Sequence, residues 1–358
     1  MIAAHSAIQR PPDAKLLVLA ADGTMVHAPR SALAEYLRPD DVVVANDAAT
    51  LPASLGGVLA PTGASIEVRL AGRRSLRPDD MHWLAIVFGA GDFRTRTEDR
   101  PPPPTLERGN RLALGPLVAK VGGVLGHPRL IGLEFEGPAG EVWAGIARHG
   151  RPIQYAHVDV PLALWDVWTP IAGPPVAFEP PSAGFALDWR LLTALRRRGV
   201  GFATLTHAAG ISSTGDPLLD AKLPFDEAYT IPEATVRAIR CTRARGGRVI
   251  AVGTTVVRAL EHAATGNVGL RAGSGLATQR IASRTRLRVV DAILSGTHEP
   301  GTSHYELLRA FADDASLRDA GAELDAHGYR THEFGDSVLI ERRHASSVQR
   351  TSRQVLAA

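Results

Sequence analysis

The sequence is poor in cysteine and in long apolar runs. Cys241 is the only cysteine among the 358 residues, so the chain has no internal disulfide and no cysteine-rich metal site. The best apolar stretch, Trp83 to Phe88, is far shorter than the roughly 20 residues that a membrane helix needs. The amino terminus lacks the basic start and the apolar core of a signal peptide. These absences predict a cytoplasmic protein in a reducing compartment, with no membrane span.

Several common catalytic patterns are also missing. There is no GxSxG nucleophile elbow, no phosphate-binding P-loop, no HExxH and no paired CxxC. The formal net charge is only +3 at pH 7, so the charge of the whole chain does not identify a nucleic-acid binder. Hydrolase, nucleotide triphosphatase and zinc-enzyme functions therefore lack their usual residues, and the sequence predicts no metal.

What the chain does contain is the alternation of strands and helices that is typical of α/β proteins. Its 45% hydrophobic and 22% charged residues are those of an ordinary globular protein. The predicted strands are Leu16–Leu19, Val42–Ala45, Gly201–Leu205, Arg248–Val252, a region near Leu287–Leu294, and Ser337–Ile340, and the predicted helices are Ala32–Leu37, Trp189–Arg197, Glu233–Ala244, Thr255–Ala264 and Ser303–Ala312. This order favours a mixed α/β catalytic body, built on a mainly parallel sheet or a barrel-like wrap.

The segment from about Leu59 to Glu141 has a different character. Ile66, Val68 and Leu70 alternate with polar residues, and the apolar segments that follow are short and punctuated by glycine. No helical period is sustained there. We therefore predict an inserted all-β domain over residues 59–149, preferably a small barrel. The α/β catalytic domain is then discontinuous and covers residues 1–58 and 150–358.

Polar and small residues follow predicted strands at several places, and ligands of α/β proteins usually bind where strands end. The pair Asn46 and Asp47 is suited to hold hydroxyl groups or to form an Asx turn. Ser182-Ala183-Gly184 is small enough for a flat ligand to approach the backbone amides, although a proline-rich linker has the same pattern. His207 suits either proton transfer near neutral pH or a structural hydrogen bond.

A fourth place combines the end of a strand with the start of a helix. Gly253, Thr254 and Thr255 open a predicted helix, so their free backbone amides and hydroxyls suit a carboxylate. Arg258 follows one turn later and is placed to add a bidentate contact. The stretch is not a GxGxxG fingerprint, so a dinucleotide is disfavoured.

Taken in order, these stretches resemble the S-adenosylmethionine:tRNA ribosyltransferase-isomerase family over nearly the whole chain. The most specific match is Ala251–Glu261, which is similar to the family's AVGTTxxRxLE motif. The other matching segments are Asp41–Gly56, Pro181–Gly184 for the family's PTAG, His207, Glu227–Ile231, Val289–Asp291, His298 with Pro300, and Tyr329–Arg330 with Phe334–Asp336. The resemblance implies an α/β catalytic body with an inserted β-barrel, in agreement with the composition changes near Leu59 and Gly150.

The resemblance also implies a reaction, in which the ribosyl moiety of S-adenosylmethionine is transferred to 7-aminomethyl-7-deazaguanine in tRNA and isomerised. The product is epoxyqueuosine, and adenine and methionine are released. The sulfonium acidifies the ribose C5′ protons, so a base starts the rearrangement without a metal or a redox cofactor. On this hypothesis the proton-transferring or polarising residues are His207, His298 and Glu227. The expected substrate contacts are Asn46, Asp47, Ser182, Ala183, Gly184 and Gly253, with Thr254, Thr255 and Arg258 on the methionine carboxylate or another anionic group and Asp336 on a ribose or amine.

Two alternatives stay open because several positions depart from the family's motifs. The family's GLHF after PTAG is Gly184–Leu187 here, without histidine, and its HxMHxE keeps only Glu227. Its TNFHLP keeps only His298 and Pro300. One alternative is an enzyme that retains the S-adenosylmethionine site but serves another acceptor, such as a small molecule. The other is a non-catalytic protein that binds a ligand or RNA.

A local cluster of arginines suits tRNA as a partner. Arg284, Arg286 and Arg288 alternate along a segment that we predict to be a strand, so they are expected to line one face and to contact phosphates. Solvated arginines without a partner are the alternative. The sequence does not determine the oligomeric state.

Overall fold

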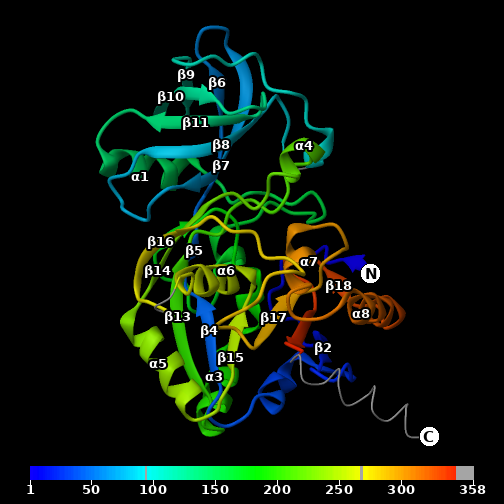
Figure 1. Cartoon of the computed structure of the whole chain (residues 1–358). Coiled ribbons are helices and arrows are strands. Elements are labelled where there is room, and N and C mark those ends of the chain that lie inside the picture. Colours follow the sequence, from blue (N-terminus) through cyan, green and yellow to red (C-terminus); the bar gives the residue numbers. More distant parts are fainter. Residues whose placement is uncertain (93–94, 267–268, 344–358) are drawn as a thin grey trace, which may run out of the picture.

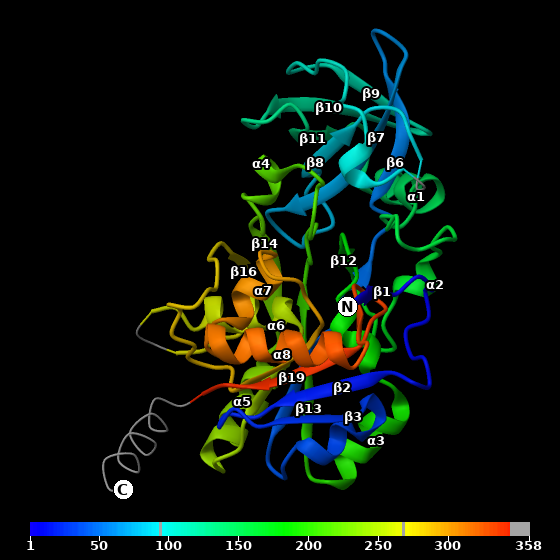
Figure 2. The ribbon, with the colours of Figure 1, turned by 90° about the vertical axis from the view of Figure 1, so that its right-hand side faces the viewer.

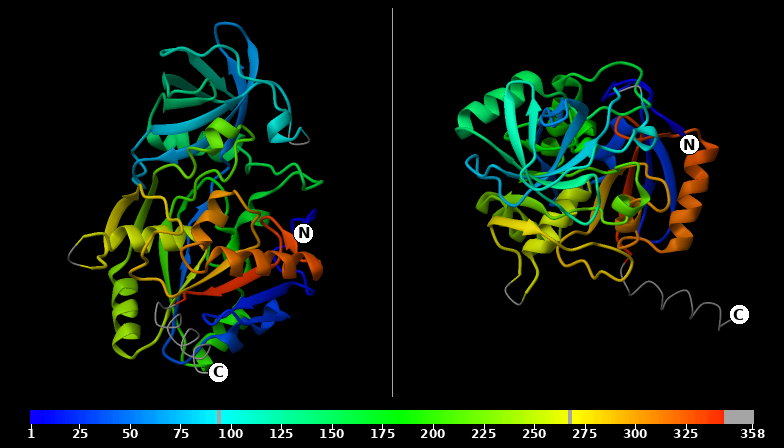
Figure 3. Two further views of the ribbon diagram at one scale, coloured as in Figure 1. Left: turned by 45° about the vertical axis from the view of Figure 1, so that its right-hand side comes forward. Right: turned by 90° about the horizontal axis from the view of Figure 1, so that it is seen from above.

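The computed structural model of the protein describes residues 1–92, 95–266 and 269–343. It has two parts, a closed barrel at the top of Figure 1 and a larger α/β body below it. The view from above in Figure 3 shows the barrel seated over the body. The predicted fold class, a mixed α/β body with an inserted β-barrel, is confirmed.

The body is built on a nine-stranded sheet with the order β16-β14-β13-β4-β15-β17-β19-β2-β3. Its strands are β2 (Lys15–Leu19), β3 (Met25–Pro29), β4 (Val42–Asn46), β13 (Gly201–His207), β14 (Glu227–Ile231), β15 (Val249–Val252), β16 (Gly273–Ala277), β17 (Ala292–Gly296) and β19 (Ser337–Glu341). The central strands β13, β4, β15 and β17 are parallel, as are β19 and β2. The remaining pairs are antiparallel. The sheet is therefore mixed, and only its centre matches the mainly parallel sheet that the sequence predicted.

The central strand β4 is apolar from Val42 to Ala45 because it is buried on both faces. Val42 and Val44 pack into one hydrophobic cluster, and Val43 and Ala45 pack into another on the opposite face. A strand enclosed in this way reads as a continuous apolar run rather than as an alternating one. Burial of each valine side chain contributes roughly 1.5–3 kcal/mol.

Helices cover both faces of the sheet. The first face carries η1 (Arg30–Tyr36) and α3 (Trp189–Arg197), and the second carries α5 (Glu233–Ala244), α6 (Thr254–Ala263), α7 (Ser303–Leu308) and α8 (Asp314–Ala326). Figure 2 shows α8 lying across β19 and β2. Short helical turns complete the body at α2 (Leu164–Val167) and η3 (Ser182–Ala186), whereas α4 (Pro217–Asp220) lies beside the barrel and packs Leu219 into its core. Within the described part of the chain, no helix has both the length and the apolar character needed to cross a bilayer.

The barrel is closed by six antiparallel strands in the order β10-β11-β8-β7-β6-β9. They are β6 (Ser54–Leu59), β7 (Ala64–Arg73), β8 (His82–Phe88), β9 (Arg111–Leu114), β10 (Leu117–Val124) and β11 (Leu130–Phe135), with η2 (Thr97–Asp99) between β8 and β9. Helix α1 (Ala139–His149) packs Val142 and Ile146 into the barrel core. The first barrel strand begins before residue 59, and the predicted domain boundaries stay a prediction.

Most predicted elements of the body are present, but one prediction was wrong. No strand contains Arg284, Arg286 and Arg288; this segment is irregular and β17 begins only at Ala292. Two pairs of short strands were also not predicted, β1 (Ile2–Ala3) with β18 (Arg330–Thr331) and β5 (Ala49–Thr50) with β12 (Pro175–Ala177). The alternating pattern of the arginine segment is typical of a strand, but the segment does not pair with a neighbouring strand of the sheet.

The parallel centre of the sheet determines where polar residues gather. Leu205 of β13 lies beside Asn46 of β4, and Val252 of β15 lies beside Ala45 and Leu294. The carboxyl ends of these strands therefore meet at one edge of the sheet. The chain leaves β4 at this edge and enters the barrel through β5 and β6, so the barrel stands over the edge.

Candidate active site

A cavity of about 740 Å³ lies at this edge, between the ends of the parallel strands and loops that include Glu98 near the barrel. Its volume is in the usual range for a small-molecule site. The predicted site residues that line it are Ser182, Ala183, Glu227, Gly253, Thr254, Thr255, Arg258 and His298. A second hollow, of about 650 Å³ over α3, contains none of the predicted site residues. Its position away from the strand ends makes it the weaker candidate.

The start of α6 supplies one part of the lining. Gly253 precedes the helix with a φ of 90°, a left-handed conformation that favours glycine. A Cβ at this position would also approach the Cβ of Ala183 to 3.3 Å. Thr254 and Thr255 occupy the first turn, where backbone N–H groups have no partner within the helix. A negatively charged ligand group in the cavity is therefore favoured here, as predicted from the sequence.

Arg258 lines the cavity but directs most of its donors into the protein. Its guanidinium forms an ion pair with Glu227 and donates to the backbone oxygens of Phe225 at 3.1 Å and Ala277 at 3.0 Å. Burial lowers the pKa of Arg258 to about 10, and the charge of Asp226 opposes this shift. Because the Arg258 guanidinium is already paired with the Glu227 carboxylate, it is not available in this arrangement for the predicted bidentate contact with a ligand carboxylate.

Glu227 connects Arg258 to His207. One carboxylate oxygen accepts the backbone N–H of Gly210 at 2.6 Å, and the other lies 3.5 Å from Nε2 of His207. His207 is fully buried and does not line the cavity, and neither ring nitrogen forms a hydrogen bond with any residue that the structure describes. Burial, with a smaller effect from the Arg258 charge, holds the pKa of His207 well below its usual value.

We refer to Glu227, Gly253, Thr254, Thr255 and Arg258 as the ion-pair wall.

Asn46 and Asp47 hold strand ends together rather than line the cavity. Asn46 donates to the carbonyl of His207 and accepts the His207 backbone N–H, both at 2.9 Å, while Asp47 accepts the Thr206 hydroxyl at 2.6 Å. The bond from Asn46 to the backbone N–H of Ala48, at 3.1 Å, is the Asx turn left open in the sequence analysis. Their contribution to the site is to fix the positions of β4 and β13.

The turn η3 brings small residues to the cavity. Ser182 and Ala183 line it, whereas Gly184 lies behind them, where a Cβ would come within 3.0 Å of Thr169. The small side chains predicted to admit a flat ligand therefore do face the cavity at two of the three positions. Gly184 is required for packing instead.

Asp336 also lies outside the cavity, which corrects its predicted contact with a ribose or amine. Its two carboxylate oxygens accept the backbone N–H groups of Lys15 and Arg330, each at 2.8 Å. Asp336 is only 1% exposed, so it joins β2 to the segment before β19 and has no surface to offer a substrate.

His298 follows β17 and lines the cavity. Its Nε2 lies 3.0 Å from the Ser295 hydroxyl, and its ring stacks on that of His304 with centroids 4.7 Å apart. Burial first, and then the charge of His304, hold the pKa of His298 well below its usual value. The imidazole is therefore neutral near neutral pH and has a nitrogen able to accept a proton.

The lining residues that the sequence analysis missed include Glu179, His304, His332 and Glu333. Glu179 accepts the backbone N–H of Ser212 at 3.0 Å, and burial followed by the charge of Glu333 raises its pKa to about 8. Together with His298 they form what we call the histidine wall. Its members come from three stretches of chain that are far apart in the sequence, so no single local motif predicts them together.

The three arginines predicted to contact nucleic acid lie outside the cavity, and all three are exposed. Arg288 donates to the carbonyls of Ala264 at 2.9 Å and Gly266 at 3.2 Å. Within the described residues, the side chains of Arg284 and Arg286 form no hydrogen bond or ion pair.

These features define an α/β protein with a ligand-sized polar cavity at the carboxyl ends of parallel strands and a barrel inserted above it. The family model described as "Queuosine biosynthesis protein" matches residues 1–340. The chain therefore belongs to the queuosine biosynthesis protein family.

Curated relatives extend over most of the chain. A protein of Sorangium cellulosum is 35% identical over 341 residues, covering 89% of this chain and 88% of that protein. A protein of Moorella thermoacetica is 31% identical, covering 91% and 92%. Both are named S-adenosylmethionine:tRNA ribosyltransferase-isomerase. The crystal structure of an S-adenosylmethionine tRNA ribosyltransferase from Thermotoga maritima matches with a TM-score of 0.50 and 24% identity, over 95% of this chain and 96% of that one, and supports the fold.

Proposed function

We propose that this chain is an S-adenosylmethionine:tRNA ribosyltransferase-isomerase. In the proposed reaction, an amine of 7-aminomethyl-7-deazaguanine in tRNA receives the ribosyl moiety of S-adenosylmethionine, which isomerises to give epoxyqueuosine. Adenine and methionine are released. The proposal is carried by one observation, the cavity that the ion-pair wall and the small residues Ser182 and Ala183 form beneath the barrel.

The start of α6 suits the methionine carboxylate of S-adenosylmethionine. Thr254 and Thr255 present hydroxyls and free backbone N–H groups to the cavity, and the positive end of the helix dipole favours an anion. Asn46 donates to the Thr255 hydroxyl at 3.4 Å and so helps to orient it. Arg258 supports this region through Glu227 rather than through the ligand.

His298 is the best-placed residue to remove a proton from the ribose C5′ next to the sulfonium. It is neutral, lines the cavity and is held by Ser295 and His304. The proton passes to the imidazole, and the electron pair stays on C5′ as a sulfonium ylide. Methionine leaves as a neutral thioether only in a later displacement, in which a new bond to C5′ replaces the S–C5′ bond, so no metal or redox step is needed for this stage. We assign Glu227 and His207 positioning roles, because both oxygens of Glu227 have partners and His207 lies behind the cavity lining.

For tRNA, we propose Arg284 and Arg286 as phosphate contacts. Both side chains are exposed and lack partners among the described residues, and Arg280, which lines the cavity, lies on the same connection. Arg288 is already bound to backbone carbonyls and is a weaker candidate. Each lost phosphate contact should reduce the slope of log affinity against log salt by about 0.7–0.9.

The test is incubation of the full chain with S-adenosylmethionine, with and without tRNA that carries the 7-aminomethyl-7-deazaguanine base, followed by mass spectrometry of all products. The expected result is epoxyqueuosine in tRNA together with equal amounts of adenine and methionine, only when the modified tRNA is present. Release of adenine without tRNA would instead favour a different acceptor. Binding of S-adenosylmethionine or RNA without any turnover would favour a non-catalytic protein.

A further inference from the structure

Three possible metal ligands meet at one end of the cavity. His157 lies in the loop after α1, and His332 and Glu333 lie in the turn between β18 and β19. Their ligand atoms are all within 4.8 Å of one another. Nε2 of His157 is 3.5 Å from Oε2 of Glu333, and the rings of His157 and His332 stack with centroids 4.4 Å apart. The chain thus brings together a group of nitrogen and oxygen donors that are distant in sequence.

Two of these donor atoms, although buried, form no hydrogen bond with any described residue and have only each other within ion-pair distance, at 3.5 Å. They are Nε2 of His157 and Oε2 of Glu333, on side chains that are only 20% and 16% exposed. A buried polar atom without a partner costs roughly 1–3 kcal/mol. Both atoms face the same small space, so a single cation there would satisfy them together.

The backbone at His332 is also constrained. Its φ is 69°, a left-handed conformation that only one other non-glycine residue of the described chain adopts. Such conformations cost on the order of 1–3 kcal/mol and persist where the surrounding structure enforces them, often at functional sites. The turn is held by the backbone N–H of Gly335, which donates to the carbonyl of His332 at 3.0 Å. This conformation keeps the His332 ring against His157.

We propose that His157, His332 and Glu333 bind a divalent transition-metal ion such as Zn²⁺. Bonds of about 2.0–2.2 Å in a tetrahedral site place ligand atoms roughly 3.4 Å apart. The observed 3.5 Å between His157 and Glu333 already meets this requirement, whereas the His332 ring, which stacks on His157 at an interplanar angle of 21°, has to rotate out of the stack to direct a nitrogen at the same ion. Two imidazoles and one carboxylate leave a fourth position open, as in catalytic zinc sites. His332 and Glu333 line the cavity, so this position is open to a substrate oxygen or nitrogen.

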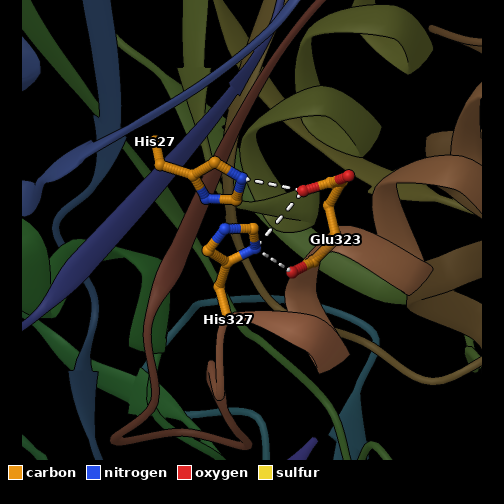
Figure 4. Close-up of side chains that lie close together, drawn as sticks. All are labelled: His27, Glu323 and His327. Carbon is orange, nitrogen blue, oxygen red and sulfur yellow. Dashed lines mark hydrogen bonds and ion pairs between the residues drawn. The ribbon is translucent and has the colours of Figure 1, made fainter.

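A second cluster, also of two histidines and one glutamate, shows how a metal site differs from side chains that hydrogen-bond to one another on the surface. His27, Glu323 and His327 lie together between β3 and α8 (Figure 4), and all three are exposed. Nε2 of His27 and Nδ1 of His327 lie 3.1 and 3.3 Å from Glu323, and Nδ1 of His27 lies 3.0 Å from the Tyr329 hydroxyl. Nδ1 of His327 also lies 2.9 Å from the Glu323 carbonyl. Every one of these nitrogens already has a partner, so this cluster is a control and not a second proposal.

The inferred site departs from the sequence expectation of no metal, which rested on the absence of compact motifs such as HExxH and CxxC. Here His157 lies far before His332 and Glu333 in the sequence, and only the fold brings the three side chains together. The proposal does not depend on the proposed reaction, because metal binding is measured without S-adenosylmethionine or tRNA.

The experiment uses the full chain, stripped with a chelator and titrated with Co²⁺ and then Zn²⁺. We expect one equivalent of Co²⁺ with the visible absorption of a four- or five-coordinate ion, and its displacement by Zn²⁺. His157→Ala and the isosteric Glu333→Gln should each weaken binding by at least about 100-fold, since losing a ligand exceeds the 10–100-fold typical of outer-shell changes. His27→Ala and Glu323→Gln, the matched controls, should bind like the parent chain. Circular dichroism establishes that each variant is folded.

The proposal is overturned by any of three results. The first is a parent chain that retains no Co²⁺ or Zn²⁺ at micromolar concentration. The second is undiminished binding by folded Glu333→Gln and His157→Ala, and the third is binding that is lost in His27→Ala instead. Zn²⁺ should also raise the midpoint of thermal unfolding of the parent chain but not of His157→Ala, because a ligand that binds only the folded state stabilises it.

Discussion

The two walls of the cavity are built from polar residues but differ in how these residues are satisfied. In the ion-pair wall, both oxygens of Glu227 and the terminal nitrogens of Arg258 have protein partners. In the histidine wall, His298 has a hydroxyl partner on one side only. Oε2 of Glu333 forms no hydrogen bond within the described part of the chain and lies 3.5 Å from Nε2 of His157. Glu179, another member of the histidine wall, has a pKa that burial raises to about 8.

This difference separates stability from chemistry. Groups that are fully paired inside the protein have little left to offer a ligand, but removing one leaves its partner buried and charged. Groups that lack partners contribute little to stability and are available to a substrate or an ion. Substitutions of the paired residues Glu227 and Arg258 should therefore act mainly on folding, and substitutions in the histidine wall mainly on turnover.

The largest expected effect is on stability, from Glu227→Gln. The change leaves the buried Arg258 guanidinium without its counter-charge, which should lower the free energy of unfolding by about 3–5 kcal/mol. Chemical denaturation followed by circular dichroism measures this. Glu233→Gln breaks an exposed i,i+4 pair with Arg237 and is the matched control, with a change below about 0.5 kcal/mol. Equal effects of the two substitutions would contradict the assignment of the ion-pair wall to stability.

The second effect is on turnover, from His298→Ala. Loss of the proposed base should reduce the rate of adenine release by at least about 100-fold. The midpoint of thermal unfolding should change far less than in Glu227→Gln, because His298 has only one hydrogen bond to lose. His82→Ala, on a barrel strand with a side chain 77% exposed, is the control. Unchanged turnover in His298→Ala would remove His298 from the mechanism.

The third effect is on binding, from Thr254→Val at the start of α6. Removal of one hydroxyl next to the proposed carboxylate should weaken S-adenosylmethionine binding about tenfold, which corresponds to roughly 1.4 kcal/mol. Isothermal titration calorimetry gives the affinity directly. Thr193→Val on the exposed side of α3 should leave it unaltered. If Thr254→Val also binds normally, the carboxylate lies elsewhere in the cavity.

The sequence predicted the ion-pair wall better than the histidine wall, for a physical reason. A strand end followed by Gly253-Thr254-Thr255 is a local signal, because the geometry of a helix start depends on adjacent residues. Glu179 and Glu333 influence each other only after the chain has folded. Asp336 was assigned to the substrate because nothing in the sequence reveals that two backbone N–H groups already occupy it.

The fold, like the site, was predicted correctly in part. The apolar run of β4 indicated a strand buried on both faces, and the alternation in β7 indicated the barrel. The prediction of a strand around Arg284 was wrong, because the alternation of arginine with other residues there resembles the pattern of a strand. No neighbouring strand pairs with it in the structure, and exposure of its arginines follows from an irregular connection.

The fourth effect concerns pH and sharpens the distinction between the walls at His207. This side chain is fully buried behind the ion-pair wall, and burial holds its pKa below the value of about 6.5 in an unfolded chain. Acid therefore protonates the unfolded state more readily, and the stability present above pH 6.5 is lost as the pH falls below it. The slope for one such group is about 1.4 kcal/mol per pH unit. His207→Gln should remove this part of the slope in urea unfolding between pH 6.5 and pH 5, whereas His82→Gln should retain it. An unaltered slope in His207→Gln would mean that the folded protein accommodates a charged imidazole beside Glu227, and His207 would then act in proton transfer rather than in positioning.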